Sequence, residues 1–422
     1  MKIAIVGLGY VGLPLAMRFA QAGVAVLGLD IDETKCAALT AGRSYIKHVP
    51  TAAIAEVRAT GLLTATTDFA QVAGVDNILI CVPTPLNDLH EPDLSYVLNT
   101  GQSLSPFLRA GQLVVLESTT YPGTTENELR TVLEQGSGLV AGRDFHLAYS
   151  PEREDPGRDP AEARRIPKVV GGLTPACRAR AEACYAQVVA QVVPVSSCRA
   201  AEATKLLENI FRAVNIALVN ELKVVYSAMD IDVWEVIEAA KTKPFGFMPF
   251  YPGPGLGGHC IPIDPFYLAW KAREFGQPTR FIELAGEINS AMPARVVECM
   301  AKTLAARNRP LSGAQILLLG LAYKADVDDD RESPSYVLIK LLEDRGATVV
   351  YHDPFVPVIR PTREYPEYAG RSSMPLSPQG YDLAVLVTAH SEYRQFDFST
   401  WDIPLIDTRN CVGKRPAIYI RA

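Results

Sequence analysis

The stretch KIAIVGLGYVGLPLAMRFAQAGVAVLGLD, residues 2–30, decides the fold of the N-terminal region. A short apolar run (2–6) leads into a Gly-rich turn, a helical pattern (11–21) and a second apolar run (24–29) that ends in Asp30. A strand, a helix and a strand within about thirty residues make the unit from which parallel sheets are built. We therefore expect a parallel, doubly wound sheet to start here.

The turn GLGYVG, residues 7–12, has the spacing of a dinucleotide-binding loop. There Gly7 makes the tight turn, Gly9 lets a pyrophosphate approach the backbone, and Gly12 allows close helix–strand packing. The helix N-terminus adds amide donors. Asp30 can bind ribose hydroxyls and repel a 2′-phosphate, which favours NAD over NADP. The predicted cofactor residues here are Gly7, Gly9, Tyr10, Val11, Gly12 and Asp30; the alternative is a turn with a structural role alone.

Apolar runs of strand length continue through the first half of the chain. Buried strands are expected at residues 77–82, 113–117, 145–149 and 188–193, and helices at residues 94–107 and 124–134. Such alternation is typical of a doubly wound α/β domain.

The pattern changes after residue 197. Residues 200–229 contain no Gly or Pro and repeat apolar residues at helical spacing, which predicts one long helix. Shorter helical segments follow, and from residue 312 strands are expected at 315–320, 348–351 and 383–387, with a helix at 335–345. The expected fold is α/β, with two Rossmann-like doubly wound domains (1–196 and 310–422) joined by a long-helix all-α central domain (197–309).

Composition argues against several classes of protein. The net charge of −6 and the lack of a basic run argue against a nucleic-acid partner. The apolar N-terminal run is broken at Arg18, short of the ~18 residues that a membrane span needs. The eight cysteines form no CxxC pair, so we expect no metal site and the reduced thiols of a cytoplasmic protein.

Cys260 follows the Gly-rich segment GPGLGG, residues 253–258. An isolated cysteine is usually buried and inert. A loop so rich in glycine, however, is typical of backbone that folds tightly around a ligand. Asp264 follows four residues later and could act as an acid or base. The segment is therefore a candidate site for a nucleophilic thiol.

Two pairs of polar residues are further candidates. Lys205 and Asn209 lie one turn apart on the expected long helix, where a half-buried pair could stabilise an oxyanion and an exposed pair would be a solvated stripe. Lys324 and Arg331 precede a helix that is expected to start at Ser333, and could cradle a diphosphate. The alternative for that segment is an acidic surface loop.

Seven motifs, in order, make the chain similar to the UDP-glucose/GDP-mannose dehydrogenase family along nearly its whole length. They are GLGYVGLPLA (7–16), CVPTP (81–85), ESTTYPGTT (117–125), YSPER (149–153), EATKLLEN (202–209), GPGLGGHCIPIDP (253–265) and GLAYKADVDDDRES (320–333). The resemblance implies an NAD domain, a helical dimer core and a C-terminal domain that binds the nucleotide of a UDP-sugar. It also implies a homodimer that forms through the central helix.

The resemblance implies covalent catalysis as well. Cys260 would attack the C6 aldehyde left by a first oxidation to give a thiohemiacetal, a second oxidation would give a thioester, and water would hydrolyse it. Lys205 and Asn209 would stabilise oxyanions, Asp264 would assist proton transfer, and Glu152 and Thr119 would position water and the reacting hydroxyl. Thr84 and Glu117 would line the nicotinamide site and Arg331 would contact the cofactor. The substrate-binding residues would be Arg153, Lys205, Asn209, Tyr251, Gly257, His259 and Lys324.

Two positions depart from the UDP-glucose branch of the family. His259 and Ile263 stand where that branch has a small residue and a lysine. Residues 149–157 and 259–262 instead resemble the branch that oxidises UDP-N-acetylhexosamines. The expected reaction is the four-electron oxidation of UDP-GlcNAc for surface polysaccharide synthesis, with UDP-GalNAc, UDP-ManNAc and UDP-glucose left open. Two other classes also stay open: a two-electron hydroxyacid dehydrogenase and a non-catalytic nucleotide-sugar sensor.

Overall fold

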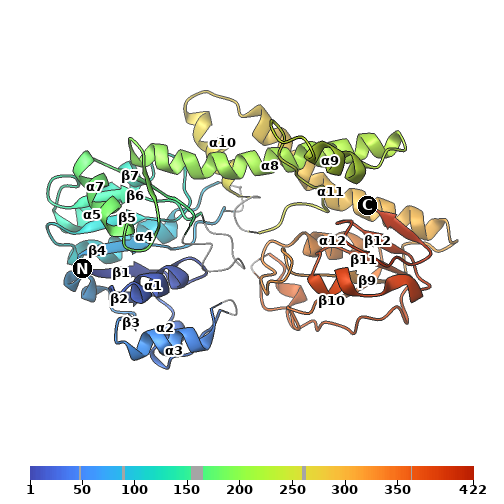
Figure 1. Ribbon diagram of the computed structural model, residues 1–422, viewed down its shortest axis with the longest axis horizontal. Coiled ribbons are helices and arrows are strands. Elements are labelled where there is room, and N and C mark those ends of the chain that lie inside the picture. Colours follow the sequence, from blue (N-terminus) through green and yellow to red (C-terminus); the bar gives the residue numbers. More distant parts are fainter. Residues whose placement is uncertain (47–48, 88–90, 154–164, 259–262, 363) are drawn as a thin grey trace. The chain divides into compact units, whose positions relative to one another are not determined.

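The structure is a computed structural model of the 422-residue chain. It describes residues 1–46, 49–87, 91–153, 165–258, 263–362 and 364–422. The chain divides into two compact units, Met1–Glu208 with Phe266–Pro278, and Asn209–Pro265 with Thr279–Ala422. Each unit contains one sheet (Figure 1).

The sheet of the first unit has eight strands. They are β1 (Lys2–Val6), β2 (Ala25–Leu29), β3 (Leu63–Thr66), β4 (Asn77–Ile80), β5 (Leu113–Leu116), β6 (His146–Tyr149), β7 (Lys168–Gly172) and β8 (Val192–Pro194). Their order is β3-β2-β1-β4-β5-β6-β7-β8, in which the first six strands are parallel and β7 is antiparallel to β6. The order of the first six strands is that of a dinucleotide-binding Rossmann fold, which confirms the expected fold class.

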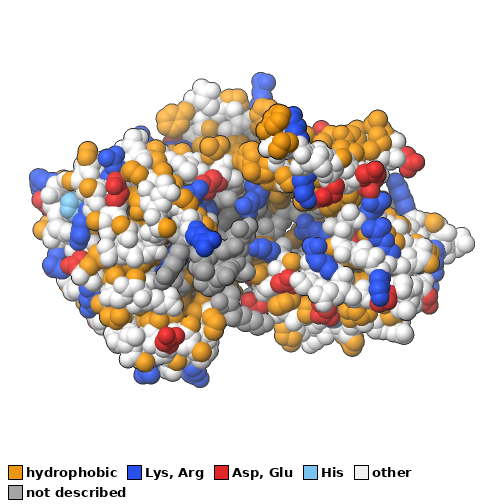
Figure 2. All heavy atoms as spheres, in the orientation of Figure 1, with side chains coloured by type: hydrophobic (Ala, Val, Ile, Leu, Met, Phe, Trp, Pro, Cys, Tyr) orange, Lys and Arg blue, Asp and Glu red, His pale blue; other side chains and the backbone are white. Residues whose placement is uncertain are grey.

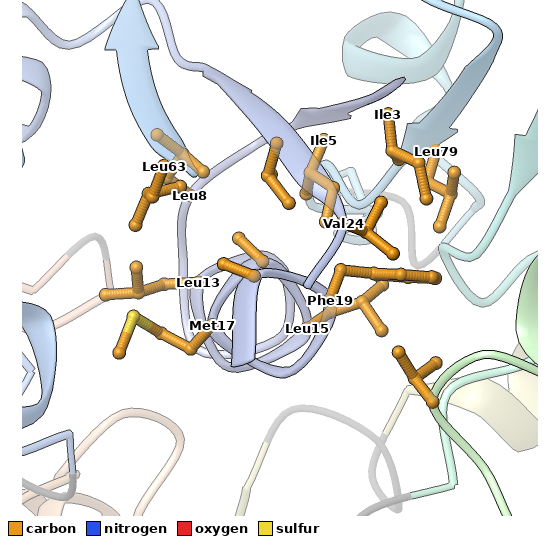
Figure 3. Packing of buried hydrophobic residues seen from close by; sticks show 14 of the residues in the cluster. Ile3, Ile5, Leu8, Leu13, Leu15, Met17, Phe19, Val24, Leu63 and Leu79 are labelled. Atoms are coloured by element: carbon orange, nitrogen blue, oxygen red, sulfur yellow. The ribbon is translucent and has the colours of Figure 1, made fainter. Parts of the chain in front are cut away.

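Helices cover this sheet on both faces, as alternation along the chain predicts. They are α1 (Gly12–Gln21), α2 (Glu33–Thr40), α3 (Thr51–Ala59), α4 (Ser95–Leu104), α5 (Arg130–Ser137), which follows a π-helical turn at Thr125–Leu129, and α7 (Pro175–Tyr185). In α1, Leu13, Leu15 and Phe19 are directed into the same buried cluster as Ile3 and Ile5 of β1 (Figure 3). This packing fixes the Gly-rich turn between β1 and α1.

The predicted strand at 188–193 is mostly wrong. Only Val192–Pro194 forms a strand, because the amides of Val188 and Val189 bond back to the Tyr185 carbonyl at the end of α7. Val188 enters the core from this turn. The short strand β3 and the antiparallel strand β7 were not anticipated. β7 ends in two glycines, and this composition does not predict a strand. The structure explains Gly171, because a Cβ there would lie 2.1 Å from the Ser197 carbonyl oxygen.

The long helix is confirmed as α8 (Cys198–Ala228), which contributes residues to both units. The other helices of the second half are α9 (Val233–Lys241), α10 (Asp264–Glu274), α11 (Arg280–Ala305), α12 (Pro334–Glu343) and α13 (Ser391–Gln395). The second sheet contains β9 (Gln315–Leu319), β10 (Thr348–His352), β11 (Leu383–Leu386), β12 (Leu405–Asp407) and β13 (Tyr419–Arg421).

The second sheet is wholly parallel in the order β10-β9-β11-β12-β13. This is the other common doubly wound order, so both expected α/β domains are present. The strands β12 and β13 escaped detection because three residues are too few to show a period. No described helix is both long enough and apolar enough to cross a membrane.

Candidate active site

The Gly-rich turn has the geometry that a pyrophosphate needs. Gly7 has a φ of 91°, and a Cβ there would lie 2.7 Å from the Cys81 carbonyl oxygen. A Cβ at Gly12 would lie 1.8 Å from the Gly7 carbonyl oxygen, whereas a Cβ at Gly9 would meet nothing within 4 Å. Gly7 and Gly12 are thus required by packing, and Gly9 leaves the backbone open to a ligand. Tyr10 and Val11 are half-buried in the same turn, and the residues present fit NAD.

Asp30 is tied to this turn. Its carboxylate accepts the Leu8 amide at 2.8 Å and the Asp32 amide at 3.0 Å, and it pairs with Lys35 Nζ at 3.1 Å. The side chain is buried. Asp30 therefore holds the turn in addition to its predicted role at the ribose, and Lys35 is a cation that the motif did not reveal.

The predicted residues Thr84, Glu117, Thr119 and Glu152 follow the carboxyl ends of β4, β5 and β6. Ligands bind at this edge in doubly wound sheets. The Thr84 hydroxyl donates to the Thr119 carbonyl at 2.7 Å. Tyr267 of α10 in turn donates to the Thr84 carbonyl at 2.5 Å. The structure therefore brings Thr84 and Thr119 together.

Glu117 lies inside a buried polar cluster with Lys168. Lys168 Nζ is 2.6 Å from Glu117 and 3.5 Å from Glu152, and the Tyr185 hydroxyl donates to Glu117 at 2.5 Å. Burial raises the pKa of Glu117 against the opposing pull of the ammonium. Burial also works against the charge of Lys168, but the two carboxylates outweigh it and raise the Lys168 pKa. Both Glu117 oxygens thus have a donor before any cofactor binds.

Lys205 and Asn209 on α8 are both buried, at 8% and 7% exposure. The alternative that Lys205 and Asn209 form an exposed, solvated stripe is therefore wrong. One turn before Lys205, Glu202 accepts the amides of Gly123 and Thr125 at 2.6 and 2.9 Å. Burial raises the pKa of Glu202 to about 7. These bonds fix α8 to the loop that follows β5.

Arg153 is held by protein groups of the first unit. Its guanidinium donates to the Pro167 carbonyl at 2.7 Å and pairs with Glu208 at 2.7 Å. The Nε atom is buried without a partner among the residues that the structure describes. Only part of Arg153 therefore remains for the predicted substrate contact.

Asn209 and Asp264 come together in the second unit. The Asn209 amide nitrogen donates to the Asp264 carboxylate, and Asp264 is 3% exposed at the first residue of α10. A buried carboxylate needs such a donor to remain charged. Cys260 and His259, the other predicted residues of this segment, lie outside the described residues.

The glycines before Cys260 pack against the second α/β domain. A Cβ at Gly257 would lie 2.8 Å from the Pro334 ring, and a Cβ at Gly258 would lie 2.9 Å from the Tyr323 ring. Side chains at these positions would push the loop off that surface. Tyr251, by contrast, stacks on Trp234 and donates to Glu238 at 2.6 Å, so it contacts α9.

The segment GLAYKADVDDDRES is not an acidic surface loop. Residues 328–330 are buried, and Asp329 accepts two bonds from Arg331 at 2.7 and 2.6 Å. Ser333 caps α12, whose first residue is Pro334, as predicted. Lys324 is half-buried in the same loop. Arg331, however, already has a carboxylate partner, which a diphosphate would have to displace or share.

Sequence reasoning missed Lys168, Glu202 and Arg409. Burial lowers the pKa of Arg409 to about 10, and its guanidinium lies so close to Gly253 that a Cβ there would be 2.4 Å from Nη1. Glu202 stands in a quoted motif and could have been found there. The other two stand in no recognised motif. In the described residues no His, Cys, Asp or Glu cluster could hold a metal ion.

Comparison with known proteins gives a consistent result. The chain matches the NAD-binding, central and UDP-binding domains of the UDP-glucose/GDP-mannose dehydrogenase family over residues 1–189, 199–291 and 317–414. It is 36% identical over 396 residues to the UDP-N-acetyl-D-glucosamine 6-dehydrogenase of Pseudomonas aeruginosa, covering 93% of this chain and 92% of that protein. It is 35% identical over 427 residues to the UDP-N-acetyl-D-mannosamine dehydrogenase of Pyrococcus horikoshii, covering 100% and 98%.

Solved structures agree with this. The structure of UDP-D-ManNAc dehydrogenase from Pyrococcus horikoshii has a TM-score of 0.90 at 33% identity and covers 100% of this chain and 98% of its own. A UDP-glucose dehydrogenase from Pyrobaculum islandicum has a TM-score of 0.88 at 27% identity, covering 99% and 96%. Together with the NAD loop and the second doubly wound sheet, these matches show that the chain is an NAD-dependent oxidoreductase and belongs to the UDP-glucose/GDP-mannose dehydrogenase family.

Proposed function

We propose that this chain oxidises the C6 alcohol of a UDP-N-acetylhexosamine, UDP-GlcNAc, to the carboxylate in two NAD-linked steps. The observation that carries the proposal is the buried Asn209–Asp264 pair, in which Asp264 follows Cys260 by four residues in sequence. The first two relatives described above act on UDP-N-acetyl sugars and differ in the sugar, so UDP-ManNAc and UDP-GalNAc are the competing substrates.

In this proposal the protein supplies a nucleophile, a proton acceptor and charge for the oxyanions. NAD, when bound, accepts the two electrons of each oxidation. Cys260 adds to the C6 aldehyde, and Asp264 takes a proton in that step while Asn209 orients its carboxylate. Among the described residues Lys205 makes no ion pair or hydrogen bond, so its buried ammonium is available to stabilise negative charge on the substrate oxygen. Glu152 and Thr119 position the hydrolytic water and the reacting hydroxyl.

Two basic side chains are proposed for the nucleotide. Lys324 lies half-buried in the loop after β9, and Arg409 is buried against the Gly-rich segment. A guanidinium offers a fork of donors that matches a phosphate. Replacement of Arg409 by Lys should therefore raise the KM for the UDP-sugar more than it lowers kcat.

The stoichiometry of NADH tests the reaction class. A panel of UDP-sugars is followed by absorbance, and the proposed four-electron oxidation yields about two NADH per sugar. A yield of one indicates a two-electron dehydrogenase, and none indicates a sensor. Cys260→Ala should abolish acid formation and leave NADH binding nearly intact, because the Gly-rich turn is separate in sequence. Acid formation by this variant at more than a few per cent of wild type would remove Cys260 from the mechanism.

The sugar is tested by kcat/KM. A pocket made for an acetamido group leaves polar groups unpaired when the substrate has a hydroxyl there, a loss of about 1–3 kcal/mol or ten- to hundredfold. UDP-glucose should be poorer by that factor than the best N-acetyl sugar. If UDP-glucose equals or exceeds all three N-acetyl sugars, the branch assignment fails and the general chemistry survives.

We also propose a homodimer that forms through α8. On this helix Phe211, Leu218, Val225 and Met229 are 45–61% exposed at intervals of seven, seven and four residues, which puts them on one face. Phe281 and Leu284 of α11 are also exposed, and apolar side chains gather in Figure 2 over the region where Figure 1 labels α9 and α11. An apolar face of this size favours a protein partner. Leu218→Glu should give monomers in light scattering at micromolar concentration, and wild-type monomers would contradict the proposal.

We propose the cytoplasm as the place of action. The seven cysteines that the structure describes are free thiols. Thiols persist in a reducing compartment.

A further inference from the structure

Lys168 lies between the carboxylates of two predicted site residues, Glu117 and Glu152. Its Nζ is 2.6 Å from a Glu117 oxygen and 3.5 Å from a Glu152 oxygen. The three side chains are 8%, 0% and 14% exposed. A single ammonium therefore serves two anions in a region that is nearly closed to solvent.

The register of the sheet explains why these residues meet. β7 is antiparallel to β6, with Ala148 opposite Gly172 and Tyr149 opposite Gly171. Continued by three residues beyond the last observed pair, this register would place Glu152 opposite Lys168. The reversal of one strand in a mostly parallel sheet thus brings a lysine to the edge where the β4, β5 and β6 segments carry the predicted site residues.

Glu117 and Tyr185 lie on the buried side of the Lys168 ammonium. The Tyr185 hydroxyl donates to the second Glu117 oxygen at 2.5 Å, and Lys168 Nζ lies 5.2 Å from the Tyr185 ring centroid. Glu117 is thereby held on both oxygens. Glu152 is the more exposed of the two carboxylates and the one that could face a substrate.

We propose that Lys168 is a positioning residue for Glu152: its ammonium, anchored by Glu117, orients the Glu152 carboxylate so that Glu152 can hold the hydrolytic water. This inference rests on the proposed function of Glu152. A charge-assisted N–H···O contact limits the rotamers of a carboxylate.

The other titratable groups around the cluster do not replace Lys168. Cys81 follows β4 and Cys184 lies on α7; burial raises the pKa of Cys81 well above its ordinary value and that of Cys184 to about 12, so both are neutral thiols at neutral pH. Arg18 of α1 adds a more distant positive charge that works against the protonation of Lys168. Lys168 lies within 4 Å of both glutamates.

The direct test is the orientation of Glu152. Carbon-13 NMR of carboxyl-labelled protein, with the Glu152 signal assigned by its loss in Glu152→Gln, reports the surroundings of this carboxylate in wild type, Lys168→Met and Lys168→Arg. Lys168→Met should move that signal, and Lys168→Arg should restore most of the difference. The matched control Lys35→Met, which removes the partner of Asp30, should leave the Glu152 signal unchanged.

Turnover gives a second readout. In Lys168→Met the kcat should fall by about ten- to hundredfold and Lys168→Arg should recover most of it, whereas the KM for the UDP-sugar should change by less than about threefold. A purely structural lysine would lower the melting temperature and leave the kcat of the folded protein in place. A folded Lys168→Met protein with an unmoved Glu152 signal would overturn the inference.

Two further outcomes are separable. If Lys168→Met does not fold, Lys168→Met with Glu117→Gln removes both charges of the buried pair, and the Tyr185 hydroxyl can still donate to the glutamine; the Glu152 signal of this variant then decides. If the wild-type protein oxidises no UDP-sugar, the proposed function fails. The NMR comparison, which needs no substrate, still shows whether Lys168 orients Glu152.

Discussion

The two sheets begin alike and differ in what their first turns can bind. Each opens with a strand and a related turn, GLGYVG at residues 7–12 and GLAYKA at residues 320–325. Gly7 and Gly320 have φ values of 91° and 90°. Their amides bond the carbonyl of the last residue of the adjacent strand, Leu29 at 2.7 Å and His352 at 2.8 Å. An aspartate follows that strand in both sheets, Asp30 in the first and Asp353 in the second.

The two aspartates differ in the number of hydrogen bonds that they accept. A carboxylate has about four lone-pair sites, and Asp30 accepts from three donors. Five reach Asp353: the amides of Leu321, Ala322, Phe355 and Val356 at 2.6–3.0 Å, and His390 Nε2 at 3.0 Å. Since His390 Nδ1 accepts the Asp326 amide, Nε2 carries the proton and donates to Asp353. Asp30 retains capacity for a ribose hydroxyl, and Asp353 is wholly structural.

The two turns also differ in the space that they leave for a ligand. Ala322 and Ala325 replace the glycines that open the first turn to a pyrophosphate and let its helix approach. The first turn therefore meets the requirements of a dinucleotide site, and the second does not, because its third and sixth residues carry side chains and Asp353 is saturated.

The largest expected effect is at Asp353. In Asp353→Asn an NH₂ group replaces one carboxylate oxygen and would face hydrogen-bond donors instead of accepting from them. These donors are either the Leu321 and Ala322 amides with His390, or the Phe355 and Val356 amides. The free energy of unfolding should fall by about 3–5 kcal/mol, measured by denaturant titration. A loss below about 1 kcal/mol would show that the bonds around Asp353 contribute little.

The pH dependence of the free energy of unfolding gives a second test of Asp353. Burial works against the charge of Asp353, but the bonds from His390 and the backbone amides outweigh it and lower the Asp353 pKa below 3.8. A lowered folded-state pKa means that this stability is present above 3.8 and is lost as pH falls through the folded-state value. The stability difference between wild type and Asp353→Asn should therefore shrink in acid, and a constant difference would contradict the assignment.

The second largest effect is expected from Gly12→Ala, in the first turn. Its Cβ would clash with the Gly7 carbonyl oxygen, and overpacking of about 1–3 kcal/mol should lower NADH affinity by roughly ten- to hundredfold as the turn shifts. Fluorescence titration with NADH measures this. Gly9→Ala is the matched variant: it should keep the melting temperature of wild type and still lose affinity, because its Cβ meets no protein atom and stands where the pyrophosphate approaches.

Asp30→Ala should narrow the preference for NAD over NADP by about 1–3 kcal/mol. It removes the carboxylate that repels a 2′-phosphate and leaves Lys35 free to attract one. Kinetics with both cofactors measure the change. Equal use of the two cofactors by the wild-type enzyme would disprove the role of Asp30 at the ribose.

The smallest effect is expected from making the second turn resemble the first. Ala322→Gly with Ala325→Gly should lower stability by about 0.5–1 kcal/mol for each glycine and create no NADH site, because Asp353 stays saturated. Calorimetric titration should find the same number of NADH molecules per chain as in wild type. An additional NADH per chain would show that turn size alone decides binding.

The parts of the fold that were predicted correctly depend on residues close together in sequence. The turn at residues 7–12 and the helix α8 follow from spacing and composition over short windows. The strand β7 could not be predicted, because its glycines are explained only by the distant backbone of Ser197 and the α7 segment that press on it. The chemical character of Lys205 and Asn209 was evident from sequence, but their burial was decided by packing.

The sequence by itself determined the NAD loop, the long helix and the family, since φ preferences, helical periodicity and motif order are local or linear properties. Only the tertiary structure decided that Lys168 serves Glu117 and Glu152, and that residues 328–330 are buried. It alone showed that Asp353 is saturated where Asp30 is not. The physical reason is that a hydrogen bond or ion pair depends on atoms brought within about 3 Å by strand register and packing, and residues far apart in sequence carry no record of that distance.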